Sequence, residues 1–245
     1  MADGAKVALV TGANKGIGYA IARGLAARGV EVLLGARDAA RRSAAVDRLA
    51  AEGHEVHGVG LDVTDPSTIA EAAAFVDERY GRLDILVNNA GITGDPTQTA
   101  GEGGLAEARK VFDVNVFGVM AVTEAMLPLL LRSAQARVVN VSSSVGSLAD
   151  MTAPDGGYLA EMPAMLGYPV SKTALSAVTA QYAKHLRKDG ILVNAVCPGY
   201  TATDLNGFAG DRTPEQGAGI AIEMALLPED GPTAGFFDDA GRVAW

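Results

Sequence analysis

The sequence predicts an α/β domain with a doubly wound, nearly all-parallel sheet of about seven strands and helices on both faces. Short apolar runs alternate with helical stretches along all 245 residues, which is the pattern of βαβ units. The apolar runs do not alternate strongly with polar residues, as expected for strands covered on both faces. No linker, repeat or low-complexity segment divides the chain, so we expect residues 1–245 to form a single domain.

The first half of the chain contains four expected strands separated by three helices. Asp38 precedes an alanine-rich stretch as a helix N-cap, Asp65 and Pro66 open the third helix, and Gly81 closes it. The expected strands cover residues 6–11, 30–36, 54–62 and 83–87, and the expected helices cover residues 19–28, 38–52 and 65–80.

The second half continues the pattern with three more helices and three more strands. The most apolar stretch, 111–131, is interrupted by Asp113, Asn115, Glu124 and Pro128, so it predicts a buried helix and not a membrane span. The expected helices cover about 105–131, 168–187 and 214–227, and the expected strands cover 137–142, 191–196 and 235–237.

Composition limits the classes of partner and site. The net charge of −9 argues against nucleic-acid or anionic-membrane partners. A single cysteine excludes an intrachain disulfide, and three scattered histidines offer no zinc-ligand spacing, so we expect no metal. The chain starts without a signal-peptide pattern, and we predict a soluble cytoplasmic protein.

A glycine-rich turn separates the first expected strand from the first helix. Gly12, Gly16 and Gly18 form the pattern T-G-x-x-x-G-x-G. Glycines there let the backbone turn tightly and approach a pyrophosphate at the helix N-terminus. The placement after the first strand predicts a Rossmann-type dinucleotide site.

The end of the second expected strand bears on the choice between NAD and NADP. Asp38 could hydrogen-bond a ribose 2′-hydroxyl, as an NAD site requires, but its position suits the helix N-cap better. Arg37 and Lys15 are both placed to meet a 2′-phosphate. We therefore favour NADP(H) as the cofactor.

Tyr168 and Lys172 lie one helical turn apart, with Pro169 in the first turn of the expected helix. Lowering a phenol pKa from about 10 to neutrality requires about 4 kcal/mol, which a positive charge ~4 Å away at a dielectric of ~20 supplies. A chance surface pair is the commoner explanation of this spacing taken alone. Tyr168 is the one tyrosine of six with lysine four residues on.

Because these features follow one another in this order, the chain resembles the short-chain dehydrogenase/reductase family over essentially its whole length. Within that family it is similar to the monomeric carbonyl reductases. The resemblance implies that Tyr168 donates a proton to the substrate carbonyl and that Lys172 lowers its pKa and holds the nicotinamide ribose. The motifs that carry it are Thr11-Gly12…Gly16-Ile17-Gly18, Asp62, Asn88-Asn89-Ala90-Gly91, Asn115, Ser143, Tyr168…Lys172 and Cys197-Pro198-Gly199…Thr203.

Two further catalytic roles follow from the resemblance. Ser143 would hydrogen-bond the carbonyl oxygen, and it is preferred over its neighbours Ser142 and Ser144 because the family pattern places the hydroxyl on the second serine. Asn115 would kink its helix and anchor a water that links Lys172 to solvent.

The resemblance also implies the residues that contact the cofactor. Asp62 would contact the adenine amino group, and Thr201 and Thr203 would hold the carboxamide. The full expected set is Gly12, Asn14, Lys15, Gly16, Ile17, Gly18, Arg37, Asp62, Val63, Asn89, Ala90, Gly91, Tyr168, Lys172, Pro198, Gly199, Thr201 and Thr203.

Two segments differ in length from most of the family. The insertion, residues 145–167, is interpreted either as a methionine-bearing rim of the substrate pocket or as a solvated excursion. We expect it to obstruct a tetramer interface, which favours a monomer, with a dimer as the alternative. The substrate segment, 204–213, is short and predicts an open pocket. Cys197 is interpreted as a small buried hydrophobe in preference to a reactive thiol.

The function that the resemblance implies is NADPH-dependent reduction of ketone and aldehyde carbonyls to alcohols. The alternative is an NADP-dependent secondary alcohol or hydroxysteroid dehydrogenase, since the chemistry is reversible. A non-catalytic NADP(H)-sensing protein is the alternative of a different class, but such members usually lack the Tyr or the Lys.

Overall fold

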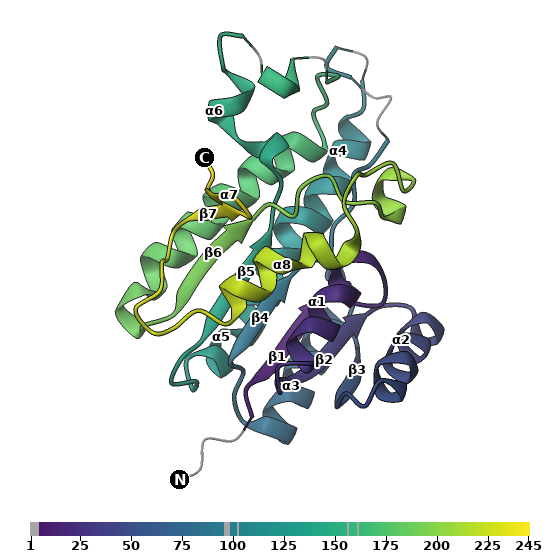
Figure 1. Cartoon of the computed structure of the whole chain (residues 1–245), viewed down its shortest axis with the longest axis vertical. Helices are drawn as coiled ribbons and strands as arrows, with labels where there is room; N and C mark the ends of the chain where they lie inside the picture. Colours follow the sequence, from purple (N-terminus) through teal and green to yellow (C-terminus); the bar gives the residue numbers. More distant parts are fainter. Residues whose placement is uncertain (1–4, 96–98, 102, 156, 161) are drawn as a thin grey trace.

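A computed structural model describes residues 5–95, 99–101, 103–155, 157–160 and 162–245. Its centre is one sheet with the strand order β3-β2-β1-β4-β5-β6-β7-β8, in which β8 alone is antiparallel to its neighbour (Figure 1). The strands are β1 Val7–Thr11, β2 Glu31–Ala36, β3 Val56–Gly60, β4 Ile85–Asn88, β5 Arg137–Val141, β6 Leu192–Val196, β7 Phe236–Asp238 and β8 Gly241–Arg242.

Helices cover both faces of this sheet, and each face has its own hydrophobic core. The helices are α1 Gly16–Ala26, α2 Ala39–Ala51 and α8 Pro214–Ala225 on one face, and α3 Pro66–Tyr80, α5 Val119–Leu130 and α7 Tyr168–Leu186 on the other. The helix α4, Leu105–Phe112, leads into α5. The predicted doubly wound α/β fold is therefore confirmed.

The strand count is the main difference from the prediction, because the sheet has eight strands and not seven. The eighth, Gly241–Arg242, pairs with β7 through Phe237 and Asp238 in a short hairpin. Two exposed residues carry no apolar pattern, so nothing in the sequence distinguished this strand from a turn.

Several helix ends follow the expected local signals. The Asp38 side chain accepts a hydrogen bond from Arg41 N at 2.8 Å, so its interpretation as an N-cap is confirmed. Asp65 caps α3, and Gly81 ends it with φ of 69°. The helix α1 begins at Gly16, three residues earlier than expected, because the end of the glycine turn is already helical.

The stretch Leu105–Leu130 is long and apolar enough to cross a membrane by length and composition, with a mean hydropathy of 1.4 over its most apolar window. Half of that window is buried inside the protein. Val122 and Met126 are fully buried in the core beneath α3 and α7. This packing supports the interpretation as a core helix.

The strand order places a crevice at the carboxyl ends of the strands. The chain leaves β1 toward β2 and β3 on one side and continues through β4, β5 and β6 on the other. At such a reversal the connecting loops diverge, and open α/β sheets bind their ligands there.

Candidate active site

A cleft of about 830 Å³ lies at this reversal. All of the predicted cofactor-binding residues line it except Gly199 and Thr201. Thr201 is 5% exposed, and its hydroxyl donates to the carbonyl oxygens of Pro198 and Gly199 instead. The predicted carboxamide contact of Thr201 would therefore need a change in these hydrogen bonds, whereas Thr203 faces the cleft.

The glycine turn forms one wall of the cleft and packs tightly on the end of β4. Gly12 has φ of 63°, and a Cβ there would lie 2.9 Å from the Cα of Ala90. A Cβ on Gly18 would lie 2.3 Å from Asn89 Nδ2, which donates to Thr11 O at 2.9 Å. These contacts require glycine.

The helix α1 starts directly beneath the cleft. No side chain caps its first turn, which begins at Gly16 after Lys15 in extended conformation. The N–H groups of an uncapped first turn and the helix dipole both favour an anion. This wall is suited to a pyrophosphate.

Cationic side chains line the same part of the cleft. Arg37 is 74% exposed at its side chain, with Nη1 3.9 Å from Asp62 Oδ2. Lys15 forms an ion pair with Asp204, which belongs to the substrate segment. Arg41 also lines the cleft, and the sequence interpretation missed both Arg41 and Asp204.

Asp62 lines the cleft, but one oxygen of its carboxylate already accepts hydrogen bonds within the protein. Its Oδ1 accepts from the N–H and the hydroxyl of Thr64, at 3.0 and 2.7 Å. These bonds fix the carboxylate at the end of β3. Its Oδ2 is the atom nearest Arg37.

Tyr168 and Lys172 project from the first turns of α7 into the cleft. The Lys172 ammonium lies 5.5 Å from the centroid of the Tyr168 ring and donates to Val141 O at 2.7 Å. Lys172 is 4% exposed. The predicted spacing therefore brings the two side chains together at the end of β5, with a carbonyl holding the ammonium.

The pKa of the Tyr168 phenol is shifted from its ordinary value in the opposite direction to the sequence prediction. Burial raises the pKa of Tyr168 to about 12, although a hydrogen bond with the Ser143 side chain lowers it in part. Burial also lowers the pKa of Lys172 to about 8. The direction at Tyr168 is opposite to the expected lowering, because loss of hydration at the half-buried phenol outweighs the effect of an ammonium that is itself buried and bonded to Val141 O.

The three consecutive serines, Ser142 to Ser144, have different hydrogen-bond partners. Ser143 lies beside Tyr168 and caps a short turn through Val145 N. Ser142 is 1% exposed, and its hydroxyl faces the Lys172 carbonyl at 3.4 Å. Ser144 donates its N–H to Cys197 Sγ. Ser143 is thus the serine whose side chain adjoins the phenol.

Asn115 lies where the predicted long helix changes its hydrogen-bonding pattern. Residues Asp113–Gly118 form a π-helical turn between α4 and α5. Asn115 Oδ1 accepts from Ile92 N at 2.9 Å, and Nδ2 donates to Ile92 O at 2.9 Å and to Ser171 Oγ at 3.0 Å. The amide therefore ties the loop after β4 to α7.

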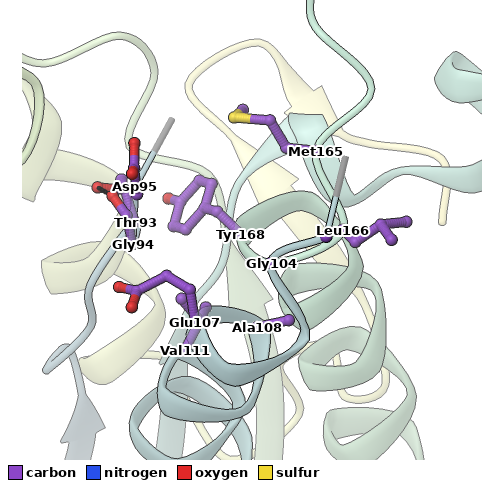
Figure 2. A pocket seen from close by; sticks show the side chains of 12 residues that line it. Thr93, Gly94, Asp95, Gly104, Glu107, Ala108, Val111, Met165, Leu166 and Tyr168 are labelled. Atoms are coloured by element: carbon purple, nitrogen blue, oxygen red, sulfur yellow. Dashed lines mark hydrogen bonds between the residues drawn. The ribbon is translucent and has the colours of Figure 1, made fainter. Parts of the chain in front are cut away.

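A much smaller cavity of about 10 Å³, roughly the space of one water molecule, adjoins the cleft at the tyrosine and shares Thr93, Gly94, Glu107 and Tyr168 with it. Figure 2 shows the Tyr168 ring facing the segment from Thr93 to Asp95, with Glu107 on the same side. The sequence interpretation missed these residues, because no motif connects them to Tyr168.

The insertion contributes to this cavity through its last residues. Met165 and Leu166 line it, and Met165 forms a β-bridge with Thr99. Met151 and Met162 are about equally exposed, at 38%, and do not line it. The rim interpretation therefore fits the end of the insertion, whereas Met151 and Met162 lie on the surface.

Cys197 is 6% exposed and packs with Ala195 and Phe236, as its interpretation as a small hydrophobe predicts. The main chain of the insertion is tied to the end of the chain, because Ala149 N donates to Trp245 O at 3.0 Å. Trp245 in turn stacks on Phe236 with ring centroids 5.7 Å apart. The monomeric state stays a prediction.

The doubly wound sheet and the cleft at its glycine turn define the class of an α/β dinucleotide-binding domain. A family model described as short chain dehydrogenase matches residues 6–213. The chain belongs to the short-chain dehydrogenase/reductase family, as the resemblance predicted.

The relatives and solved structures agree with this family. The chain is 36% identical to salutaridine reductase of Papaver bracteatum, over 98% of this chain and 96% of that one. It is 36% identical to carbonyl reductase [NADPH] 1 of Sus scrofa, over 100% and 96%. The crystal structure of NADPH-bound carbonyl reductase from chicken fatty liver is 31% identical, with a TM-score of 0.86 over 98% of this chain and 99% of that chain.

Proposed function

We propose that this protein reduces ketone and aldehyde carbonyls to alcohols with NADPH. The observation that carries the proposal is the position of Tyr168, which is hydrogen-bonded with Ser143 at the junction of the cleft and the smaller cavity. A carbonyl in the cleft would meet the Tyr168 hydroxyl, and Ser143 is the hydrogen-bonding neighbour of that hydroxyl.

Bound NADPH would supply the hydride that adds to the carbonyl carbon, which oxidises the cofactor to NADP⁺. The electron pair of the C=O π bond moves to the oxygen, and the Tyr168 phenol gives that oxygen its proton. A pKa of about 12 keeps this phenol protonated at neutral pH, so the donor form is the populated one. The Ser143 hydroxyl stabilises the charge that develops on the oxygen.

The residues at the adenosine end of the cleft support NADP(H). Arg37 and Lys15 both line the cleft, and both can turn from their surface ion pairs to a 2′-phosphate, because exposed pairs are weak. The names of the Sus scrofa relative and the chicken structure both include NADPH.

The activity is tested by following NADPH absorbance with a panel of ketones, aldehydes, β-keto esters and quinones. We expect oxidation of NADPH with several neutral carbonyl compounds, because the residues beside Tyr168 are mainly small and apolar. Absence of turnover with every member of the panel would contradict the proposal.

Replacing Arg37 by Ala should raise the KM for NADPH by roughly ten- to hundredfold, since a hydrogen bond to a charged group contributes about 1.5–3 kcal/mol. The KM for NADH should change little, because NADH carries no 2′-phosphate. Arg28→Ala is the matched control, since Arg28 is exposed and its guanidinium donates to Gly24 O of α1. Equal responses of both cofactors to Arg37→Ala would show that the 2′-phosphate assignment is wrong.

Oxidation of a secondary alcohol by the same site is the second candidate. The chain is 35% identical to (+)-neomenthol dehydrogenase of Arabidopsis thaliana over 98% of its length. The steps above run in reverse with the same atoms, and the Tyr168 phenolate then accepts the proton. Alcohol oxidation should therefore accelerate as the pH rises toward the pKa of Tyr168, whereas carbonyl reduction should not.

A further inference from the structure

The turn that follows β5 carries Ser143 and packs directly against the first turns of α7. Its own hydrogen bonds hold it together, because Val145 N donates to Ser143 Oγ at 3.4 Å and Gly146 N donates to Ser143 O at 2.9 Å. The sheet fixes its first end, where Ser142 N donates to Val196 O at 2.8 Å. The position of Ser143 therefore also depends on what holds the other end of the turn, at Gly146.

Gly146 lies against the backbone of α7 too closely for any side chain. A Cβ on Gly146 would lie 2.6 Å from Lys172 Cβ, 2.7 Å from Lys172 C and 2.8 Å from Thr173 N. This close approach requires glycine. The far end of the turn thus lies directly on the helix that carries Tyr168 and Lys172.

A threonine of α7 bonds the turn at this contact. The Thr173 hydroxyl donates to Gly146 O at 2.8 Å, and Pro169 O lies 3.2 Å from the same hydroxyl oxygen. Gly146 is buried and Thr173 is half-buried, so loss of the hydroxyl would take this partner from a buried carbonyl. Neither residue lines the cleft or the smaller cavity. Thr173 therefore acts on the site through the turn and not by contact with a ligand.

We propose that Thr173 is a positioning residue that holds Ser143 against the Tyr168 phenol. The inference rests on the proposed carbonyl reduction, in which these two hydroxyl groups act on the same oxygen. The hydrogen bond between the Ser143 side chain and the phenol needs both groups in place, and small displacements of reacting groups are costly. Thr173 secures the end of the turn that the sheet does not hold.

Replacing Thr173 by Val removes the hydroxyl and keeps the shape of the side chain. We expect kcat for carbonyl reduction to fall by about tenfold, since a misplacement of about 1 Å costs up to about a hundredfold in rate. The KM for NADPH should stay near the wild-type value, because Thr173 does not line the cleft. Thr173→Ser keeps the hydroxyl and should restore kcat, whereas Thr173→Ala lacks it, suits a helix and should reproduce the loss.

Thr179→Val is the matched control for a purely structural effect. Thr179 lies on the same helix and is fully buried, and its hydroxyl donates to Leu175 O and accepts from Asn140 Nδ2, both at 2.8 Å. Its loss should lower the urea midpoint of unfolding at least as much as Thr173→Val does, because it leaves the buried Asn140 amide without this partner. It should leave kcat near the wild-type value, since Thr179 lines neither the cleft nor the smaller cavity.

A double-mutant cycle with Ser143→Ala tests whether Thr173 acts through Ser143. Thr173→Val should lower kcat when Ser143 is present and change it little in the Ser143→Ala background, because the hydroxyl that it positions is then absent. A residue that acts on the helix in general would lower kcat by the same factor in both backgrounds.

A wild-type kcat in Thr173→Val, a loss that Thr173→Ser does not restore, or equal factors in both backgrounds would each overturn the inference. An equal loss of kcat in Thr179→Val would do the same. If Ser143→Ala lowers kcat and Thr173→Val does not, the positioning role alone fails. If the wild-type enzyme reduces no carbonyl compound of the panel, the proposed function itself fails.

Discussion

Tyr168→Phe is expected to lower kcat for carbonyl reduction by about a hundred- to ten-thousandfold, the usual contribution of a general acid. The substitution removes one hydroxyl and keeps the ring, which is half-buried beside Ser143 and Lys172. Binding of NADPH should be retained, because the glycine turn and the charged groups at the mouth of the cleft are untouched. Turnover followed by NADPH absorbance and binding followed by NADPH fluorescence measure the two effects separately.

Tyr182→Phe is the matched control for this variant. Tyr182 lies on the same helix α7, and its hydroxyl donates to Glu124 Oε1 at 2.6 Å, away from the cleft. Its loss should leave turnover near that of the wild type. Turnover near the wild-type value in Tyr168→Phe would remove the phenol from the mechanism.

Asn115→Leu is expected to lower the free energy of unfolding by about 1–3 kcal/mol, because it leaves the N–H and C=O of Ile92 without their partner. It should also lower kcat by up to about a hundredfold, since the loop from Ile92 to Gly94 lines the site and small displacements of reacting groups are costly. Urea unfolding and steady-state turnover measure the two effects.

Val122→Ala provides the comparison for Asn115→Leu. Val122 is fully buried in α5, and its truncation lowers stability by leaving a cavity in the core. We expect it to leave turnover near the wild-type value, since Val122 lines neither cavity. Equal effects of both substitutions on turnover would show that Asn115 acts through general stability and not through the loop.

Most of the fold was predictable because its signals are local. The apolar runs became strands β1 to β7, and the caps at Asp38 and Asp65 start their helices as expected. The misses fall where local signals are weak. The strand β8 has two exposed residues. The kink expected at Asn115 takes the form of a π-helical turn, a form that the apolar pattern of one long helix does not indicate.

The candidate site was predictable to a similar extent and for a related reason. Its motifs lie at the ends of strands, which parallel pairing brings to one edge of the sheet. Glu107 and Asp95 were not predictable, since they reach Tyr168 only because α4 and the loop after β4 pack beside α7. The same holds for the ion pair between Lys15 and Asp204, which are 189 residues apart.

The sequence by itself determined the family, the glycine turn and the pairing of Tyr168 with Lys172, because each depends on the spacing of residues along a strand end or a helix. Only the tertiary structure decided the direction of the Tyr168 pKa and the carboxylates of the cavity. The physical reason is that loss of hydration and charge contacts depend on every atom around a group, and those atoms come from segments far apart in the chain.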